Sequence, residues 1–296
     1  MRTSSTPALV AIAALVAAMV SYQFGASLAK HLFPAVGAEG ATAYRLGLSA
    51  IILVLLRRPW RASTSSTKKD WRVLWGYGLA IGAMNFVFYM SLRTIPLGIA
   101  VALEFTGPLA LALFHSRRLI DFVWMALVIA GLLLLLPLRG IDKPLDPVGV
   151  MYALAAGVGW ALYIILGRKA GAAFGATAVP LGISIGALAT IPIGFAYAGT
   201  ALFSLDLLPY ALGVAVLSSA LPYSLEMVAM TRMSTRTFSV LLSLEPAIAA
   251  LAGVALLSEN LGLLQWSAIA AIMVAAAGTA LSVRRPASEN EPLPIG

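Results

Sequence analysis

Ten stretches of about twenty mainly apolar residues follow one another along this chain, and each is long enough to cross the hydrocarbon core of a bilayer. They lie at residues 8–29, 39–56, 73–92, 96–114, 119–138, 148–167, 177–198, 207–229, 237–257 and 262–283. Hydrocarbon permits only helices or closed barrels, and these continuous runs lack the alternation of barrel strands. The sequence therefore predicts an all-α membrane protein with ten transmembrane helices.

The composition supports this class and excludes several others. Of 296 residues, 60% are hydrophobic and 11% are charged, whereas about a quarter of a soluble domain is charged. The chain has no cysteine, which excludes disulfides and thiolate metal sites. It also has no Walker A, HExxH or dinucleotide-binding motif. We therefore expect neither an enzyme nor a cofactor or metal.

The basic residues predict how the chain is oriented. The net charge of +8 arises mainly in short loops between apolar spans, where it sets membrane orientation and implies no nucleic-acid partner. With both termini in the cytoplasm, fifteen of the twenty basic residues fall on the cytoplasmic side. The others are Lys30, Arg93, Arg139 and Lys143 on the opposite side, and Arg45 inside a span.

An internal repeat relates the two halves of the chain. GATAYRLGLS at 40–49 recurs as GATAVPLGIS at 175–184 with seven identities in ten, and later segments keep an offset close to 138 that pairs Pro108 with Pro246. We expect a first five-helix repeat at 1–140, a second at 141–285 and a cytoplasmic tail at 286–296. Because five is odd, the second copy enters the membrane from the opposite side, which is the inverted-repeat design of secondary transporters.

Apart from Glu39 and Asp121, which belong to the first residues of their spans, three carboxylates lie inside predicted spans: Glu104, Glu245 and Glu226. A carboxylate at the bilayer centre costs about 2.5 to 3.5 kcal/mol on insertion scales, so such residues usually have a function. Glu104 and Glu245 lie about 12 Å into their spans by helical rise. We expect them to bind a substrate ammonium group or to carry a proton. The alternatives are a buried ion pair with Arg45 and, for Glu226, a side chain that reaches water at the membrane surface.

Two cations are further candidates. Arg45 lies about 9 Å below the outer surface and could bind a carboxylate through two parallel hydrogen bonds, or could instead pair with Glu39 or Glu104. Lys30 ends the first predicted span, where a solvated anchor is the alternative to a functional role.

Polar and aromatic side chains of four predicted helices could line a passage. They are Tyr22, Gln23, Asn85, Tyr89, Trp160, Tyr163 and Tyr223. Interfacial aromatic belts and interhelical hydrogen bonds are the alternative explanations. The GxxxG spacings at Gly78 and Gly82 and at Gly182 and Gly186 predict close helix packing.

Three blocks, at 25–46, 96–124 and 221–250, carry a resemblance to known transporters. The chain resembles the EamA-type branch of the drug/metabolite transporter superfamily, and within it the bacterial inner-membrane group that exports threonine and homoserine. The resemblance implies a central cavity between two five-helix repeats and amino-acid export, with protons as the coupling partner in an alternating-access antiport.

The matching blocks contain five candidates: Glu104, Glu226, Glu245, Arg45 and Lys30. The resemblance favours these positions for the cavity. Substrate range drifts within one fold, so an exporter of another amino acid, a drug or a nucleobase stays open, as do a passive channel and a membrane-embedded enzyme. The oligomeric state stays open as well.

Overall fold

The computed structural model of the chain describes residues 6–61, 67–114, 119–135, 145–222, 225–226, 229 and 241–282. Within these ranges every regular element is a helix and no strand occurs, which confirms the all-α prediction. The α-helices are α1 (Thr6–Arg57), α2 (Lys68–Ser91), α3 (Leu97–Phe114), α4 (Leu119–Leu135), α5 (Pro147–Phe174), α6 (Ala178–Ala198), α7 (Leu208–Ala215), α10 (Glu245–Leu257) and α11 (Leu263–Ser282). Short 3₁₀ turns are η1 (Pro59–Arg61), η2 (Gly175–Thr177) and η3 (Gly199–Phe203), and the π-helix η4 (Val216–Ala220) continues α7.

Three helical stretches of the described chain are long and apolar enough to cross a membrane: Val10–Arg61, Lys68–Ser91 and Pro147–Phe203. The first and the third each contain two of the predicted spans, because the helix continues through the connection between them. Shorter apolar helices occupy the other predicted spans: Leu97–Leu111, Phe122–Gly131, Leu208–Ala220, Glu245–Leu257 and Leu263–Gly278. The number of ten crossings stays a prediction.

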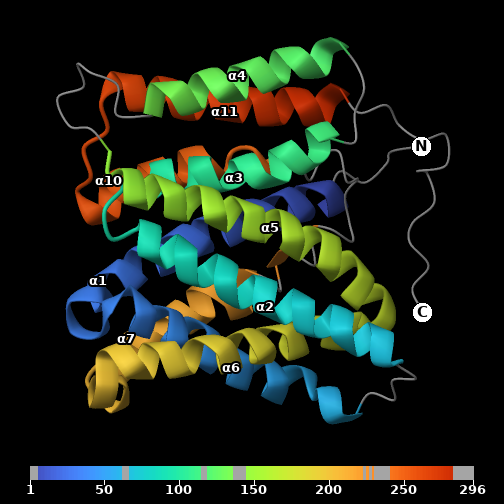
Figure 1. Cartoon of the computed structure of the whole chain (residues 1–296), viewed down its shortest axis with the longest axis vertical. Coiled ribbons are helices and arrows are strands. Elements are labelled where there is room, and N and C mark those ends of the chain that lie inside the picture. The colour runs from blue at the N-terminus through green and yellow to red at the C-terminus, as the bar shows by residue number, and fades with distance from the viewer. Residues whose placement is uncertain are drawn as a thin grey trace.

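The connection between the first two spans differs from the prediction. A loop was expected at residues 30–38, but α1 is helical through Pro34 and departs from helical geometry only at Gly37, with φ 69° and ψ 175°. A positive φ is accessible to glycine because it has no Cβ, so one residue reverses the chain direction. The predicted loop is wrong, and Figure 1 shows the two arms of α1 meeting at this kink.

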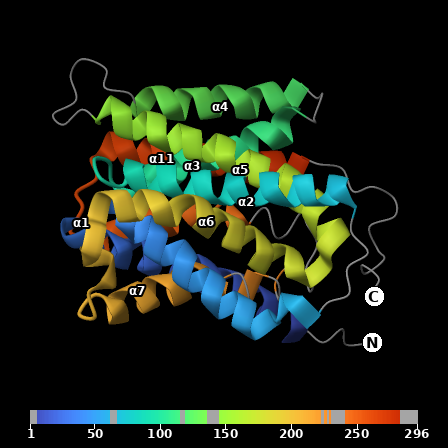
Figure 2. The ribbon, with the colours of Figure 1, turned by 60° about the horizontal axis from the view of Figure 1, so that its bottom comes forward.

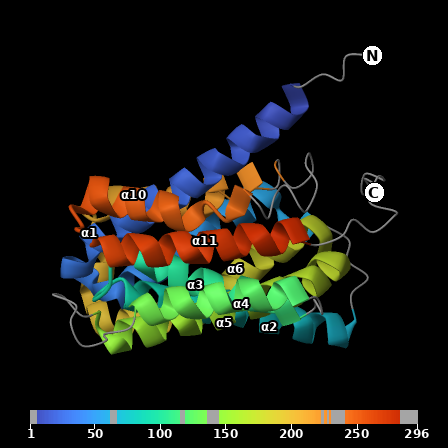
Figure 3. The ribbon, with the colours of Figure 1, turned by 90° about the horizontal axis from the view of Figure 1, so that it is seen from above.

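The helices run nearly parallel or antiparallel in one bundle (Figure 1). The second arm of α1 packs against α6, α3 packs against both α5 and α10, and α4 packs against α11. Figures 2 and 3, turned from the first view, keep α4 and α11 together at one side of the bundle. The kink of α1 and the α2–α3 and α10–α11 connections lie at one end, opposite the Arg57 end of α1 and the first turn of α2.

Glycines let helices of the two halves approach closely. A Cβ added to Gly82 would lie 3.1 Å from the Gly186 backbone, and one added to Gly78 would lie 2.6 Å from the Gly182 carbonyl oxygen. The predicted GxxxG packing is confirmed, because the two motifs face each other across α2 and α6. A tighter crossing occurs between α3 and α5, where a Cβ on Gly107 would lie only 1.9 Å from a backbone oxygen of α5.

Candidate functional site

Polar side chains from both arms of α1 donate hydrogen bonds to the backbone at the π-helix η4. Ser21 Oγ donates to the Leu217 carbonyl at 2.8 Å, and Ser49 Oγ donates to the Ala215 carbonyl at 3.2 Å. A π-helix shifts backbone hydrogen bonds from their α-helical partners and is frequent at functional sites. These contacts hold the irregular segment against α1 in the interior of the bundle.

Arg45 forms the cationic centre of this interior. Its guanidinium donates from an Nη to the Ser218 carbonyl at 3.1 Å and lies 5.3 Å from the centroid of the Tyr89 ring, a cation–π contact. The residue is 7% exposed. A pairing of Arg45 with Glu39, considered from sequence, is wrong, because Glu39 binds Arg93 at 3.2 Å instead.

Two carboxylates enter the same interior from α3 and α10. Glu104 and Glu245 are each 9% exposed, and Gln23 Nε2 donates to Glu245 Oε1 at 3.4 Å, a long hydrogen bond. Glu104 is close enough to Glu245 to be repelled by it, and close enough to Arg45 to be attracted. Glu226, half-buried, also lies within electrostatic range of Glu245. The structure thus brings the three predicted acids and Arg45 into one region, which are four of the five positions that the resemblance favours for the cavity.

Several hydroxyl groups beside Arg45 have no hydrogen-bond partner in the part of the chain that the structure describes. The Tyr89 hydroxyl and the Ser218 and Ser219 hydroxyls are buried without a hydrogen bond to any described residue. A buried polar group without a partner costs about 1 to 3 kcal/mol, so it usually has water or a ligand as partner. The sequence analysis missed Ser218 and Ser219. Their only signal is a pair of serines in an apolar span, which is too common to identify a site.

Other predicted candidates belong to ordinary packing in the structure. Asn85 Nδ2 donates to the Ile81 carbonyl of its own helix at 2.8 Å. Tyr163 stacks on Tyr77 with ring centroids 5.3 Å apart, and Trp160 meets Phe105 edge to face at 5.5 Å. These contacts favour the packing explanation over a passage.

Tyr22 is half-buried in the first arm of α1, next to Ser21, which donates a hydrogen bond to the Leu217 carbonyl. Tyr223 lies outside the described residues. No group of three or more potential metal ligands occurs among the residues that the structure describes.

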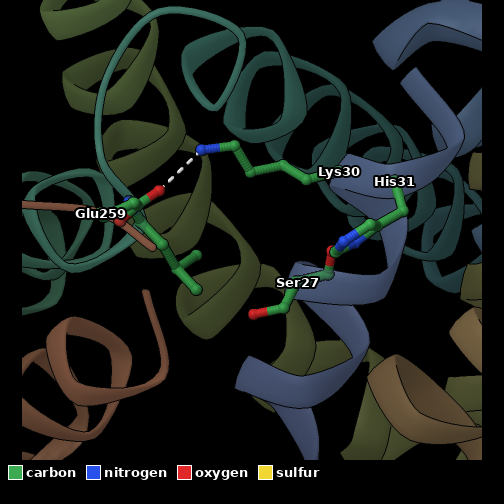
Figure 4. Close-up of polar contacts among 5 residues, drawn as sticks. Ser27, Lys30, His31 and Glu259 are labelled. Atoms are coloured by element: carbon green, nitrogen blue, oxygen red, sulfur yellow. Dashed lines mark hydrogen bonds and ion pairs between the residues drawn. The ribbon is translucent and has the colours of Figure 1, made fainter. Parts of the chain in front are cut away.

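Lys30 lies away from this interior, at the end of the bundle near the α1 kink. Its Nζ binds Glu259 Oε1 at 2.7 Å, and the second carboxylate oxygen of Glu259 accepts a hydrogen bond from the Leu97 backbone N–H at 2.8 Å. The next residue, His31, places its Nδ1 2.9 Å from the carbonyl oxygen of Ser27, which lies one turn earlier on α1 (Figure 4). Lys30 is therefore a partner in an ion pair rather than a solvated anchor.

The comparisons with known proteins agree with this architecture. The chain is 50% identical over 285 residues to the threonine/homoserine exporter RhtA of Escherichia coli (strain K12), covering 96% of each protein. It is also 50% identical over 283 residues to the protein of that name from Salmonella typhimurium (strain LT2), covering 96% of this chain and 95% of the other. The EamA-like transporter family matches residues 147–281. The chain belongs to this family.

The EamA-like match covers the second predicted repeat, whereas the two relatives align with nearly the whole chain. One solved crystal structure has a similar fold to this chain, with a TM-score of 0.56. The two are 18% identical, and the match covers 94% of this chain and 97% of the other. At that identity the likeness concerns the fold alone.

Proposed function

We propose that this EamA-like transporter exports small amino acids, threonine and homoserine among them, by secondary active transport. The 50% identity to exporters of that name supports the cargo. The observation that carries the site is the buried guanidinium of Arg45 close to the carboxylate of Glu104, inside a chain that otherwise dissolves in lipid. Isolated ionised groups are too costly in such an interior to be kept without a function.

A zwitterionic amino acid fits this pattern of charge. In our proposal the substrate carboxylate binds Arg45, with the Tyr89 and Ser218 hydroxyls as further donors. The ammonium group binds Glu104 or Glu245, and a proton occupies the same carboxylates when the substrate has left. Gln23 then orients Glu245 through its amide.

The architecture we propose is two inverted five-helix repeats, 1–140 and 141–285, followed by a tail at 286–296, ten helices in all. The contacts of α3 with α10, of α4 with α11 and of the second arm of α1 with α6 support it, because each joins helices that the repeat makes equivalent. A two-fold axis in the membrane plane brings equivalent helices together in this way. The halves then rock about the central site to open it alternately to each side.

We place the protein in the bacterial inner membrane with both termini in the cytoplasm. The Arg57 end of α1, the first turn of α2 and the last turns of α5 carry clustered basic residues, as the cytoplasmic side does. Lys30, Glu259 and the α1 kink then face the outside.

Efflux of labelled threonine and homoserine from loaded cells tests the proposal. We expect Glu104→Gln and Glu245→Gln each to reduce efflux by about tenfold or more, on the scale of one lost charge-assisted hydrogen bond. Asp206→Asn, which alters an exposed acid in the α6–α7 connection, is the matched control and should export normally. Wild-type efflux in both glutamine variants would refute the site.

The driving force needs a separate measurement. With purified protein in vesicles, an imposed pH gradient should drive threonine against its concentration, and collapsing the gradient should leave only slow equilibration. A passive channel would equilibrate threonine at the same rate with and without the gradient.

A further inference from the structure

Ser219 carries a buried hydroxyl that the proposed carboxylate and ammonium contacts do not use. The residue is 1% exposed, and its hydroxyl forms no hydrogen bond within the described ranges. It follows Ser218 on the π-helix η4, and the Ser218 carbonyl accepts a hydrogen bond from the Arg45 guanidinium at 3.1 Å. The Cα atom of Ser219 therefore belongs to the same peptide unit as the carbonyl that Arg45 binds.

Other buried hydroxyls of the bundle are satisfied by the backbone just before them. Each donates to a carbonyl three or four residues earlier in the chain, and they belong to Thr42, Ser49, Ser91, Thr177 and Thr190. This local bond gives a buried hydroxyl a partner without any ligand. Ser219 forms no such bond to the residues before it, so its hydroxyl needs a partner from elsewhere.

The geometry of η4 explains this difference. The carbonyls that Ser219 would use in the local pattern are those of Ala215 and Val216. The Ser49 hydroxyl donates to the Ala215 carbonyl at 3.2 Å, and the Leu221 N–H donates to the Val216 carbonyl in the π-helical pattern. Both carbonyls are already bonded, so the π-helix leaves the Ser219 hydroxyl as a buried donor and acceptor for another group.

The proposed cargo carries a group of matching chemistry. Threonine and homoserine are both α-aminobutyrate with one added hydroxyl, on the β carbon in threonine and on the γ carbon in homoserine. With the substrate carboxylate on Arg45, this hydroxyl is only a few bonds from the guanidinium, and Ser219 adjoins the carbonyl that the same guanidinium binds. Because a hydroxyl both donates and accepts, serine and substrate can bond in either direction.

We propose that Ser219 is the specificity-determining residue for the side-chain hydroxyl of the exported amino acid. This inference rests on the proposed export of threonine and homoserine. Arg45 and Ser218 bind the carboxylate, which all amino acids share, whereas Ser219 binds the group that α-aminobutyrate lacks. A site built to bond a substrate hydroxyl rejects the analogue without it, because the buried polar group of the site then has no partner. The transporter therefore prefers small hydroxy amino acids to their deoxy analogue.

The test measures the concentration dependence of uptake into inverted vesicles that contain the full-length protein. Threonine, homoserine and α-aminobutyrate are the three probes. We expect the wild type to bind either hydroxy amino acid about tenfold or more tightly than α-aminobutyrate. Ser219→Ala should lose most of this preference, because threonine and homoserine bind more weakly while α-aminobutyrate binds as before or better.

Three further variants separate specificity from structural damage. Ser218→Ala should weaken all three probes alike and keep the preference, because the carboxylate is common to them. Ser91→Ala removes a buried hydroxyl that already donates to the Phe88 carbonyl at 2.6 Å, so this matched control should keep the preference. Ser219→Cys retains nearly the same side-chain shape, but a thiol is a weak donor, so it should lose the preference even if Ser219→Ala does not accumulate.

Loss of the preference in the Ser219 variants, with its retention in Ser218→Ala and Ser91→Ala, would support the assignment. An unchanged preference in the Ser219 variants, or an equal weakening of all three probes there, would overturn it. If the wild type transported all three probes with equal affinity, the proposed cargo would stand and the role of Ser219 would be wrong. If it transported none of them, the proposed cargo would fail first, and this inference with it.

Discussion

The charged groups at the end of the bundle near the α1 kink and those in the middle of the bundle are built differently. At the end, Lys30 and Glu259 meet at 2.7 Å, and Glu39 and Arg93 meet at 3.2 Å. In the middle, the hydrogen bond described for Glu245 is a 3.4 Å contact from an amide. Each of these end carboxylates has a cationic partner, whereas the Tyr89, Ser218 and Ser219 hydroxyls of the central region have no hydrogen bond to a described residue. The contrast suggests where the protein holds its shape and where it binds.

The largest expected effect comes from replacing the cation of each region by the other basic residue. Arg45→Lys should reduce threonine efflux by about tenfold or more, because an ammonium group cannot form the two parallel bonds that a carboxylate takes from guanidinium. Lys30→Arg should keep most of the activity, because Glu259 can pair with either cation. Efflux rates of the two variants at equal expression measure the contrast, and equal losses would remove it.

A smaller effect is expected from Gln23→Leu, which removes the amide that contacts Glu245. Losing a buried hydrogen bond of this kind costs about 1 kcal/mol, so the apparent substrate affinity should fall a few-fold while the maximal rate changes little. Concentration dependence of uptake into inverted vesicles measures both quantities. Gln23→Glu is the informative companion, since a fourth acid there should weaken binding by repelling Glu245 further or by competing for the proton.

Arg93→Gln should have less effect on transport than any change at the centre. Its side chain is 51% exposed and that of its partner Glu39 is 6% exposed, so the part-buried pair should contribute about 1 kcal/mol, the upper end of the range for exposed pairs. The thermal unfolding midpoint in detergent should fall by a few degrees at most, and efflux should stay near wild type. A severe loss of efflux would mean that this pair takes part in transport.

The smallest effect concerns Asp146, which caps α5 outside the membrane. The Thr94 hydroxyl and the first N–H groups of α5 hold the pKa of this carboxyl below its ordinary value. A lowered folded-state pKa stabilises the protein above the ordinary pKa of aspartate, about 3.9, and the gain is lost as the pH falls through the folded value. The stability advantage over Asp146→Asn, measured by thermal unfolding, should be full at pH 7 and shrink below about pH 4.

The helical class and the buried acids could be predicted from the sequence, because each follows from the free energy of placing one segment or one side chain in lipid. A long apolar run can only be a membrane helix, and Glu104 or Glu245 inside one needs a reason wherever the run lies. The extension of helix α1 from the first predicted span to the kink at Gly37 was not predicted, because the predicted spans were placed by apolar length alone. Local patterns do not show which single residue will take the positive φ.

The partners of the charged residues were harder to predict than their burial. Glu259 lies 229 positions from Lys30 along the chain, and no local pattern connects them. No sequence pattern distinguishes the π-helix at Val216–Ala220 from an ordinary apolar helix. The buried Ser218 and Ser219 hydroxyls could therefore be identified only from the structure.

The glycine crossing of α2 and α6 has a mechanical consequence. Gly82 and Gly186 meet backbone to backbone, so at this point neither helix places a side chain in a groove of the other. A seam of that kind depends on the absence of a Cβ at both positions. A bulkier residue at either one would act as a wedge that separates α2 from α6, and with them the two halves of the protein.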